Sequence, residues 1–148
     1  MLFSCVCNKP HSHNERMCVT MKTEPKFFRC SKCGNLVGLI FNGGGTMTCC
    51  GQEMEELVAN TVDASAEKHV PVFEQTGSTV MVKIGSVEHP MLEEHHIEWI
   101  YLNTTKGGQR KNLVVGKAPI AEFKLADGEE LISVYEYCNL HGLWKAEA

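Results

Sequence analysis

Apolar residues in the second half of the chain occur in short runs that turn-forming residues separate. Residues 121–125 alternate apolar and charged side chains, as a strand with one buried face does. The strand candidates are residues 80–84, 97–102, 121–125 and 131–135. Glycine-containing turn signals follow at residues 77–78, 106–108 and 127–128. Because no segment has the periodicity of a helix, the pattern predicts an antiparallel β-sandwich over residues 58–148.

A shorter unit precedes the sandwich, over residues 21–57. A strand at residues 27–29 leads into Cys30-x-x-Cys33-Gly34, a turn in which both sulfurs can face one metal and the glycine supplies a positive φ. A second apolar strand and a glycine-rich turn then return the chain to Cys49-Cys50. The sequence predicts a small metal knuckle, with the domain boundary near residues 57–60.

Residues 1–20 differ from the rest of the chain because they contain few core-forming side chains. We expect an N-terminal extension that is either disordered or not translated, with Met21 as an alternative start. The alternative is a third metal site of the form Cys-x-Cys followed by His-x-His. Its ligands would be drawn from Cys5, Cys7, His11, His13 and Cys18.

Composition excludes several classes of protein. The chain has 148 residues, 43% of them hydrophobic, and a formal net charge of -4. A negative balance argues against nucleic acid as a partner, because phosphate binding needs a basic face. No apolar run reaches the roughly 18 residues of a membrane helix. The N-terminus lacks the pattern of a signal peptide. We therefore expect a cytoplasmic protein without a membrane or nucleic-acid partner.

Cysteine content points to metal. The chain has eight cysteines, and clustered cysteines in a reducing compartment are more often metal ligands than disulfides. Cys30, Cys33, Cys49 and Cys50 form one tetrathiolate set, which suits zinc or iron. The adjacent Cys49 and Cys50 depart from the spacing of two Cys-x-x-Cys knuckles, and we interpret this departure as favouring iron.

A second constellation contains histidines. Cys138 and His141 form a Cys-x-x-His pair near the C-terminus, and the further candidates upstream are His69, His89 and His95. His95 is in phase with Ile97 on the expected core face, whereas the adjacent His96 is in phase with exposed positions. We therefore predict His95 as a ligand and His96 as a surface residue.

Four imidazoles and one thiolate suit a borderline metal such as iron. Five protein ligands leave one octahedral position open, which favours redox chemistry on a small molecule over a purely structural role.

These motifs resemble those of superoxide reductases. The resemblance rests on Glu67-Lys68-His69-Val70-Pro71, on Glu88-His89-Pro90-Met91, on His95 with Trp99, and on Cys138 to Trp144. The front unit, Cys30-x-x-Cys33 with Cys49-Cys50, looks like desulforedoxin. Together they resemble the two-iron form of the family, desulfoferrodoxin, over about residues 26–148.

The resemblance implies a mostly β fold, in which a desulforedoxin-like knuckle precedes an immunoglobulin-like sandwich of seven strands. It implies two irons per chain, one Fe(Cys)4 and one Fe(His)4(Cys) with Cys138 axial. The implied activity is that of an oxidoreductase that detoxifies superoxide by reducing it to hydrogen peroxide without making oxygen. Lys68 would attract the anion and help to supply a proton, and Glu67 would occupy the vacated iron position after turnover. A rubredoxin-type electron donor and a homodimer are also implied.

Two other classes of function compete with this one. One is a rubredoxin-like electron carrier without superoxide chemistry, and the other is a zinc-stapled interaction module. Lys106, Arg110 and Lys111 form a basic segment. We interpret it as a solvated turn, with docking of an acidic donor as the alternative.

Overall fold

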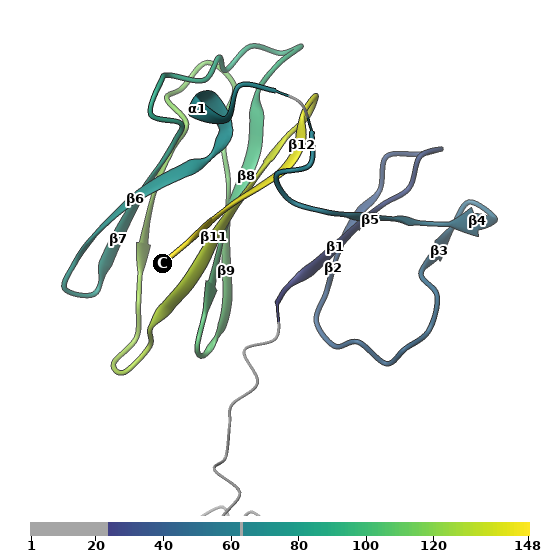
Figure 1. Cartoon of the computed structure of the whole chain (residues 1–148), viewed down its shortest axis with the longest axis horizontal. Coiled ribbons are helices and arrows are strands. Elements are labelled where there is room, and N and C mark those ends of the chain that lie inside the picture. Colours follow the sequence, from purple (N-terminus) through teal and green to yellow (C-terminus); the bar gives the residue numbers. More distant parts are fainter. Residues whose placement is uncertain (1–23, 63) are drawn as a thin grey trace, which may run out of the picture.

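The N-terminal unit is a small β knuckle. The structure, a computed structural model, describes residues 24–62 and 64–148 (Figure 1). Residues 1–20, with their possible third metal site, lie outside the described residues. The strands of the unit are β1 (Lys26–Arg29), β2 (Leu36–Leu39), β3 (Thr48–Cys49), β4 (Gln52–Glu53) and β5 (Glu55–Leu57). Strand β1 lies between β2 and β5, and β3 pairs with β4 in a separate hairpin.

The rest of the described chain is an antiparallel sandwich. Its elements are α1 (Ala66–His69), β6 (Pro71–Thr76), β7 (Thr79–Ile84), β8 (Ile97–Thr104), β9 (Gly107–Asn112), β10 (Ile120–Lys124), β11 (Leu131–Cys138) and β12 (Gly142–Glu147). One sheet has the order β10-β7-β6 and the other β12-β11-β8-β9. Every pairing is antiparallel. The predicted fold class, a metal knuckle followed by an immunoglobulin-like sandwich, is confirmed.

Alternating side chains from both sheets form the core. Val80, Val82 and Ile84 of β7 are fully buried, and the residues between them are exposed. They pack with Phe123 of β10 and with apolar side chains of β8 and β11. Cys138, at the end of β11, belongs to the same cluster. The core therefore extends to the end of the sandwich where the predicted histidine ligands occur.

The opposite face of β8 and β11 receives the knuckle. Phe27 of β1 is buried against Trp99, Tyr101 and Tyr135, with ring centroids 5.1, 5.4 and 5.8 Å away. Tyr137 stacks on Trp99 at 5.6 Å. An aromatic layer thus joins the two units.

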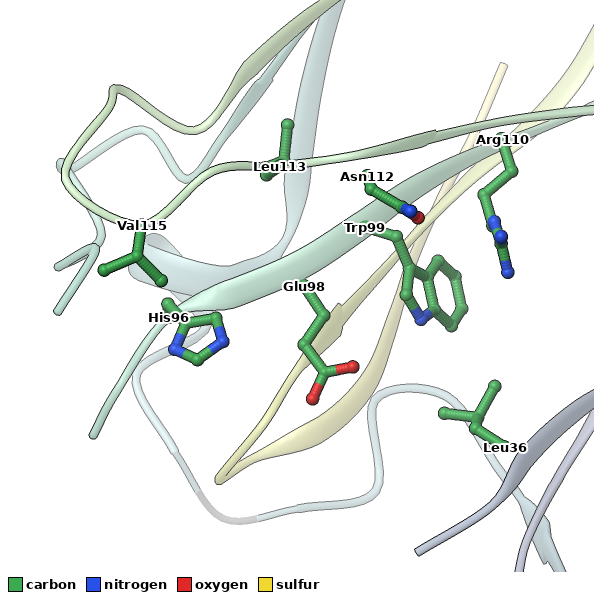
Figure 2. A pocket seen from close by; sticks show the side chains of 8 residues that line it. All are labelled: Leu36, His96, Glu98, Trp99, Arg110, Asn112, Leu113 and Val115. Carbon is green, nitrogen blue, oxygen red and sulfur yellow. The ribbon is translucent and has the colours of Figure 1, made fainter. Parts of the chain in front are cut away.

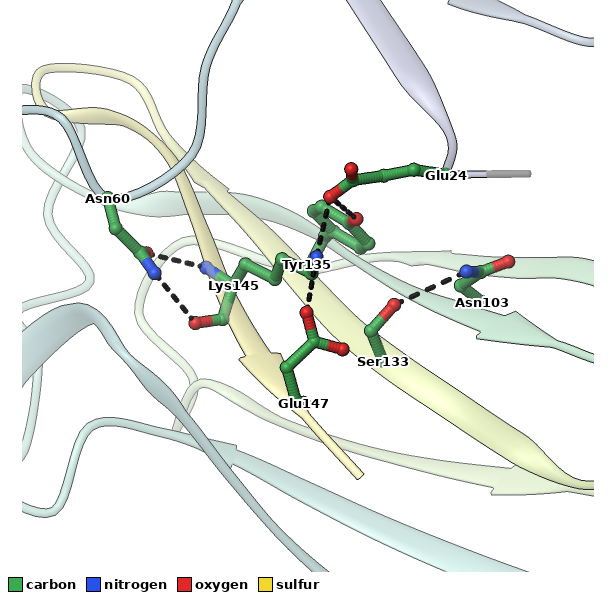
Figure 3. Close-up of polar contacts among 7 residues, drawn as sticks. All are labelled: Glu24, Asn60, Asn103, Ser133, Tyr135, Lys145 and Glu147. Carbon is green, nitrogen blue, oxygen red and sulfur yellow. Dashed lines mark hydrogen bonds and ion pairs between the residues drawn. The ribbon is translucent and has the colours of Figure 1, made fainter. Parts of the chain in front are cut away.

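Polar contacts at strand β12 reinforce this junction (Figure 3). The Glu24 carboxylate accepts hydrogen bonds from the Lys145 ammonium and, at 3.1 Å, from the Tyr135 hydroxyl. Lys145 and Tyr135 thereby lower the pKa of Glu24. The Asn60 side chain donates to the backbone carbonyl of Lys145 at 3.1 Å and accepts from its amide at 2.8 Å. These bonds fix the linker between the units against β12.

Two expectations about local structure were wrong. No segment was expected to be helical, but Ala66–His69 form the one-turn helix α1. Arg110 and Lys111 were expected in a turn, but they lie in β9, which pairs with β8. Among the described residues, no helix has the length and apolar character that a membrane crossing requires.

Candidate functional site: two clusters of metal ligands

The first cluster is built by two turns of the knuckle. After β1, the Gly34 amide donates to the Cys30 carbonyl at 2.9 Å with φ of 77°, which closes the turn that holds Cys30 and Cys33. Cys49 ends β3, and Cys50 follows with a left-handed φ of 52°. That conformation is uncommon for a residue with a Cβ. It directs two successive side chains toward the opposite turn.

The four sulfurs are spaced as a tetrahedral metal site requires. Metal–sulfur bonds of about 2.3 Å place tetrahedral sulfurs about 3.8 Å apart. The Cys49 sulfur lies 3.7 Å from that of Cys33 and 3.9 Å from that of Cys50, and all four lie within 4.8 Å of one another. Backbone amides of Cys33 and Lys32 lower the pKa of the Cys30 thiol to about 7, which favours the thiolate that binds metal.

The second cluster forms at one end of the sandwich. His69 ends α1, His89 and His95 lie between β7 and β8, Cys138 ends β11, and His141 lies in the turn before β12. The structure brings all five of these predicted residues together, with their ligand atoms within 4.8 Å of one another. Elements far apart in sequence therefore converge on one point.

Nitrogen spacings in this cluster fit adjacent positions around one ion. Metal–nitrogen bonds of about 2.1 Å at right angles place two nitrogens about 3.0 Å apart. The His69 Nε2 atom lies 2.9 Å from His141 Nδ1 and 3.1 Å from His89 Nε2. The Cys138 sulfur lies 3.6 Å from His141 Nδ1 and 3.7 Å from His89 Nε2.

His95 provides independent support for a metal site. Its Nε2 atom is buried and has no hydrogen-bond partner among the described residues. A buried polar atom without a partner is costly, and a metal ion would satisfy it. The donor set therefore fits a resident metal, both because the ligand spacings are right and because the metal would satisfy the buried His95 Nε2 atom.

Backbone carbonyls orient two of the histidines. His69 Nδ1 lies 2.8 Å from the Ser65 carbonyl, and His89 Nδ1 lies 2.6 Å from the Pro90 carbonyl. A carbonyl can only accept, so each Nδ1 donates its proton and leaves Nε2 free for a metal. His141 instead presents Nδ1 to the cluster.

Burial favours the neutral form of three of the imidazoles. It lowers the pKa of His69 and His95, and it lowers the pKa of His89 to about 4. Neutral imidazole is the form that binds metal. Burial also raises the pKa of Cys138, although amides of His141 and Leu140 oppose that effect. A bound cation would favour the thiolate further.

Lys68 and Glu67 lie in α1, directly before His69. Glu67 is exposed and Lys68 is half-buried. The positive charge of Lys68 adds to the effect of burial in lowering the pKa of His69 and His95. Lys68 thus places a positive charge on the residue directly before the first ligand of the cluster.

His96 lies apart from the cluster, as predicted. It lines an open groove with Glu98, Trp99 and Arg110 (Figure 2), and its Nδ1 bonds to the Leu92 carbonyl at 2.9 Å.

In the basic segment, the ammonium groups of Lys106 and Lys111 donate to the backbone carbonyls of Asp127 and Glu122. Two of its three charges are thus held against the chain's own backbone.

Sequence reasoning missed two residues beside the second cluster. Glu136 is fully buried in β11, and neither carboxylate oxygen has a partner among the described residues. Its period-two phase with Val134 and Cys138 was the signal that could have found it. Trp144 of β12 stacks on His69 and donates to the His141 carbonyl.

Comparisons with known proteins agree with these two clusters. The family model described as "Desulfoferrodoxin, N-terminal domain" matches residues 23–57, and "Desulfoferrodoxin" matches residues 61–147. A desulfoferrodoxin of Syntrophotalea carbinolica is 46% identical, over 86% of this chain and 99% of its own. One of Nitratidesulfovibrio vulgaris is 44% identical, over 86% of this chain and 100% of its own.

Among solved structures, the superoxide reductase from Treponema pallidum has a TM-score of 0.72 and 41% identity, over 84% of this chain and 100% of its own. Both parts of the chain are thus matched in order, and each contains one of the two ligand clusters. The chain belongs to the desulfoferrodoxin family.

Proposed function

We propose that the chain is a superoxide reductase, an oxidoreductase that detoxifies superoxide by one-electron reduction to hydrogen peroxide without producing oxygen. The observation that carries this proposal is the convergence of four imidazoles and one thiolate on one point. Two mononuclear irons complete the protein. One is held by Cys30, Cys33, Cys49 and Cys50, and the other by His69, His89, His95, His141 and Cys138.

Five protein donors distinguish the second site from a structural staple, which is usually four-coordinate. When bound there, iron supplies the single electron that superoxide takes up. Two protons complete the balance, since superoxide, one electron and two protons give one hydrogen peroxide.

We assign the anion-attracting role to Lys68. Its positive charge directly precedes the ligand His69 in α1, and a charge beside a site can raise the arrival rate of an anion by about 10-fold or more. Local steering of this kind outweighs the net charge of -4, because distant charges are screened beyond about 8–10 Å. Lys68 also holds the water that delivers a proton to the product. Glu67, the exposed neighbour of Lys68, is the candidate carboxylate for the coordination position that the product leaves.

Partners and organisation form part of the same proposal. Residues 21–57 and 58–148 act as two domains, and a rubredoxin-type donor supplies electrons. Adjacent Ile40 and Phe41, 103% and 82% exposed on the knuckle, support a homodimer that covers them. We place the protein in the cytoplasm, where a reducing environment keeps clustered cysteines available as metal ligands.

The experiment combines metal analysis with direct kinetics. We expect two irons per chain, Fe(Cys)4 absorption bands, and a separate thiolate-to-iron band that appears on oxidation of the second site. The pre-reduced protein, mixed with a superoxide pulse, should form one peroxide per superoxide consumed and release no oxygen. A reduced protein that carries both irons but does not consume superoxide would be an electron carrier instead. A colourless zinc protein would be the stapled module.

A further inference from the structure

Gly85 packs against the backbone of the helical turn that presents Glu67 and Lys68. It is buried, follows β7 directly, and has a φ of 75°. A Cβ at this position would lie 2.5 Å from the Val87 carbonyl oxygen, 2.6 Å from that of Lys68 and 2.8 Å from that of Glu67. All three are backbone atoms, so none can move aside as the end of a flexible side chain can. Only glycine permits this approach.

Hydrogen bonds from the same segment hold the turn in place. The Val87 amide donates to the Glu67 carbonyl at 3.0 Å, and the Ser86 hydroxyl donates to the same oxygen at 3.3 Å. The Gly85 amide donates to the Val70 carbonyl at 3.2 Å. Residues 85–87, which we call the 85–87 turn, thus bond to α1 at Glu67 and to Val70, the residue that follows the helix.

Helix α1 needs such support. It has four residues, and its N-cap Ser65 makes no side-chain capping bond. So short a helix is not stable by itself, because nucleation fixes several dihedral angles for few hydrogen bonds. The 85–87 turn directly follows Ile84, which is fully buried in the sandwich core and anchors it there. The position of α1 is therefore set by the core through this turn.

We propose that the 85–87 turn positions Lys68 beside the histidine cluster, so that Gly85 and Ser86 are positioning residues for superoxide reduction. The inference rests on the proposed role of Lys68, which directly precedes the ligand His69 in α1. Displacement of the α1 backbone moves the ammonium and weakens its attraction for the incoming anion, since the field of a charge falls steeply with distance in water.

The test compares two glycines that both have a positive φ. Gly85→Ala and Gly77→Ala both place a Cβ at positive φ, but nothing lies within 4 Å of the Cβ position at Gly77. The measured quantity is the rate constant of the pre-reduced protein with superoxide at several ionic strengths. We expect Gly85→Ala to lower it about threefold to tenfold at low salt and to flatten its salt dependence. Gly77→Ala should leave both unchanged.

A second readout does not depend on activity. The Val87 amide bonds to the Glu67 carbonyl, and the Val70 amide bonds to that of Ala66. Hydrogen exchange at these two amides should accelerate in Gly85→Ala and stay unchanged in Gly77→Ala. Ser86→Ala removes only the hydroxyl donor from an exposed side chain, so it provides a milder test where Gly85→Ala does not fold.

A double-mutant comparison separates this inference from the proposed function. If the turn acts through Lys68, Gly85→Ala or Ser86→Ala should slow the reaction in the native background and have no further effect beside Lys68→Ala. If Lys68→Ala slows the reaction but neither turn variant does, the positioning role is overturned and the role of Lys68 stands. If Lys68→Ala has no effect, both the positioning role of the turn and the anion-attracting role of Lys68 are overturned.

Discussion

Trp144 contacts two ligands of the histidine cluster at once. Its indole lies against the ring of His69, with centroids 4.9 Å apart and planes 19° apart. Its Nε1 atom donates to the His141 carbonyl at 3.2 Å. The side chain is buried, so neither contact is shared with solvent. One residue of β12 thus packs against the His69 imidazole and holds the backbone of the turn that carries His141.

Replacement of Trp144 by leucine should therefore weaken iron binding at the histidine cluster. Loss of partners that orient ligands typically reduces metal affinity about 10–100-fold. We expect faster iron release to a chelator from this site, while the Fe(Cys)4 bands stay unchanged. Tyr101→Leu, which removes an aromatic ring packed against Phe27 away from the cluster, is the control. Equal release rates in the Trp144 variant and the native protein would contradict this role.

Cys30→Ser should separate the two centres functionally. Cys30 is fully buried in the knuckle, and the two ligand clusters share no residue. We expect loss of the Fe(Cys)4 bands and an unchanged single turnover of superoxide by the pre-reduced second iron. Cys138→Ser, which removes the thiolate of the histidine cluster, should show the reverse pattern. Loss of the single turnover in Cys30→Ser would mean that the chemistry has been placed at the wrong centre.

Asn35 should set the potential of the knuckle iron. Its side-chain amide donates to the Cys49 sulfur at 3.6 Å. A donor to sulfur stabilises negative charge, and the reduced centre is the more negative state, so the bond raises the reduction potential. Asn35→Ala should lower the potential by tens of millivolts, where about 59 mV is a tenfold change in the equilibrium. The matched control is Asn42→Ala, since Asn42 accepts from the Gly44 amide instead. A shift equal to that of the control would show that the contact has no electrostatic effect.

Period-two alternation was sufficient to predict much of the sandwich, because successive side chains of a strand point to opposite faces, as those of β7 do. His95 joins the cluster and His96 does not, as expected, but both residues precede β8. Ile97 packs in the sandwich core and Trp99 on the opposite face against the knuckle, so strict alternation does not hold at the start of β8. The Cys-x-x-Cys-Gly turn was equally readable, because its geometry is local to five residues.

Helix α1 and strand β9 were not predictable in this way. The four residues of α1 are barely one helical period, and contacts with the 85–87 turn hold them in place. Strand β9 has the sequence GGQRKN and is almost entirely exposed, so it has no apolar alternation. It exists because β8 offers backbone partners along its edge. In both places tertiary contacts override local preference.

Glu136 makes the free energy of unfolding of the protein depend on pH. It lies fully buried in β11 without a hydrogen-bond partner among the described residues, and burial raises its pKa well above the usual value of 4.5. The folded protein therefore keeps this proton at a pH where the unfolded chain has lost it. Unfolding then releases a proton, so stability falls as pH rises from about 4.5 toward the folded pKa. The slope approaches about 1.36 kcal/mol per pH unit.

Glu136→Gln should remove that slope, because glutamine does not titrate. A buried amide without partners has its own free-energy cost, but that cost does not change with pH. We therefore expect the free energy of unfolding of the variant, relative to the native protein, to rise between about pH 5 and about pH 7. Denaturant titrations with both proteins in the same metal state measure it. Glu122→Gln, which neutralises a half-exposed carboxylate on β10, is the control for net charge. A difference between Glu136→Gln and the native protein that stays constant with pH would show that the Glu136 carboxyl ionises as readily in the folded state as in the unfolded chain.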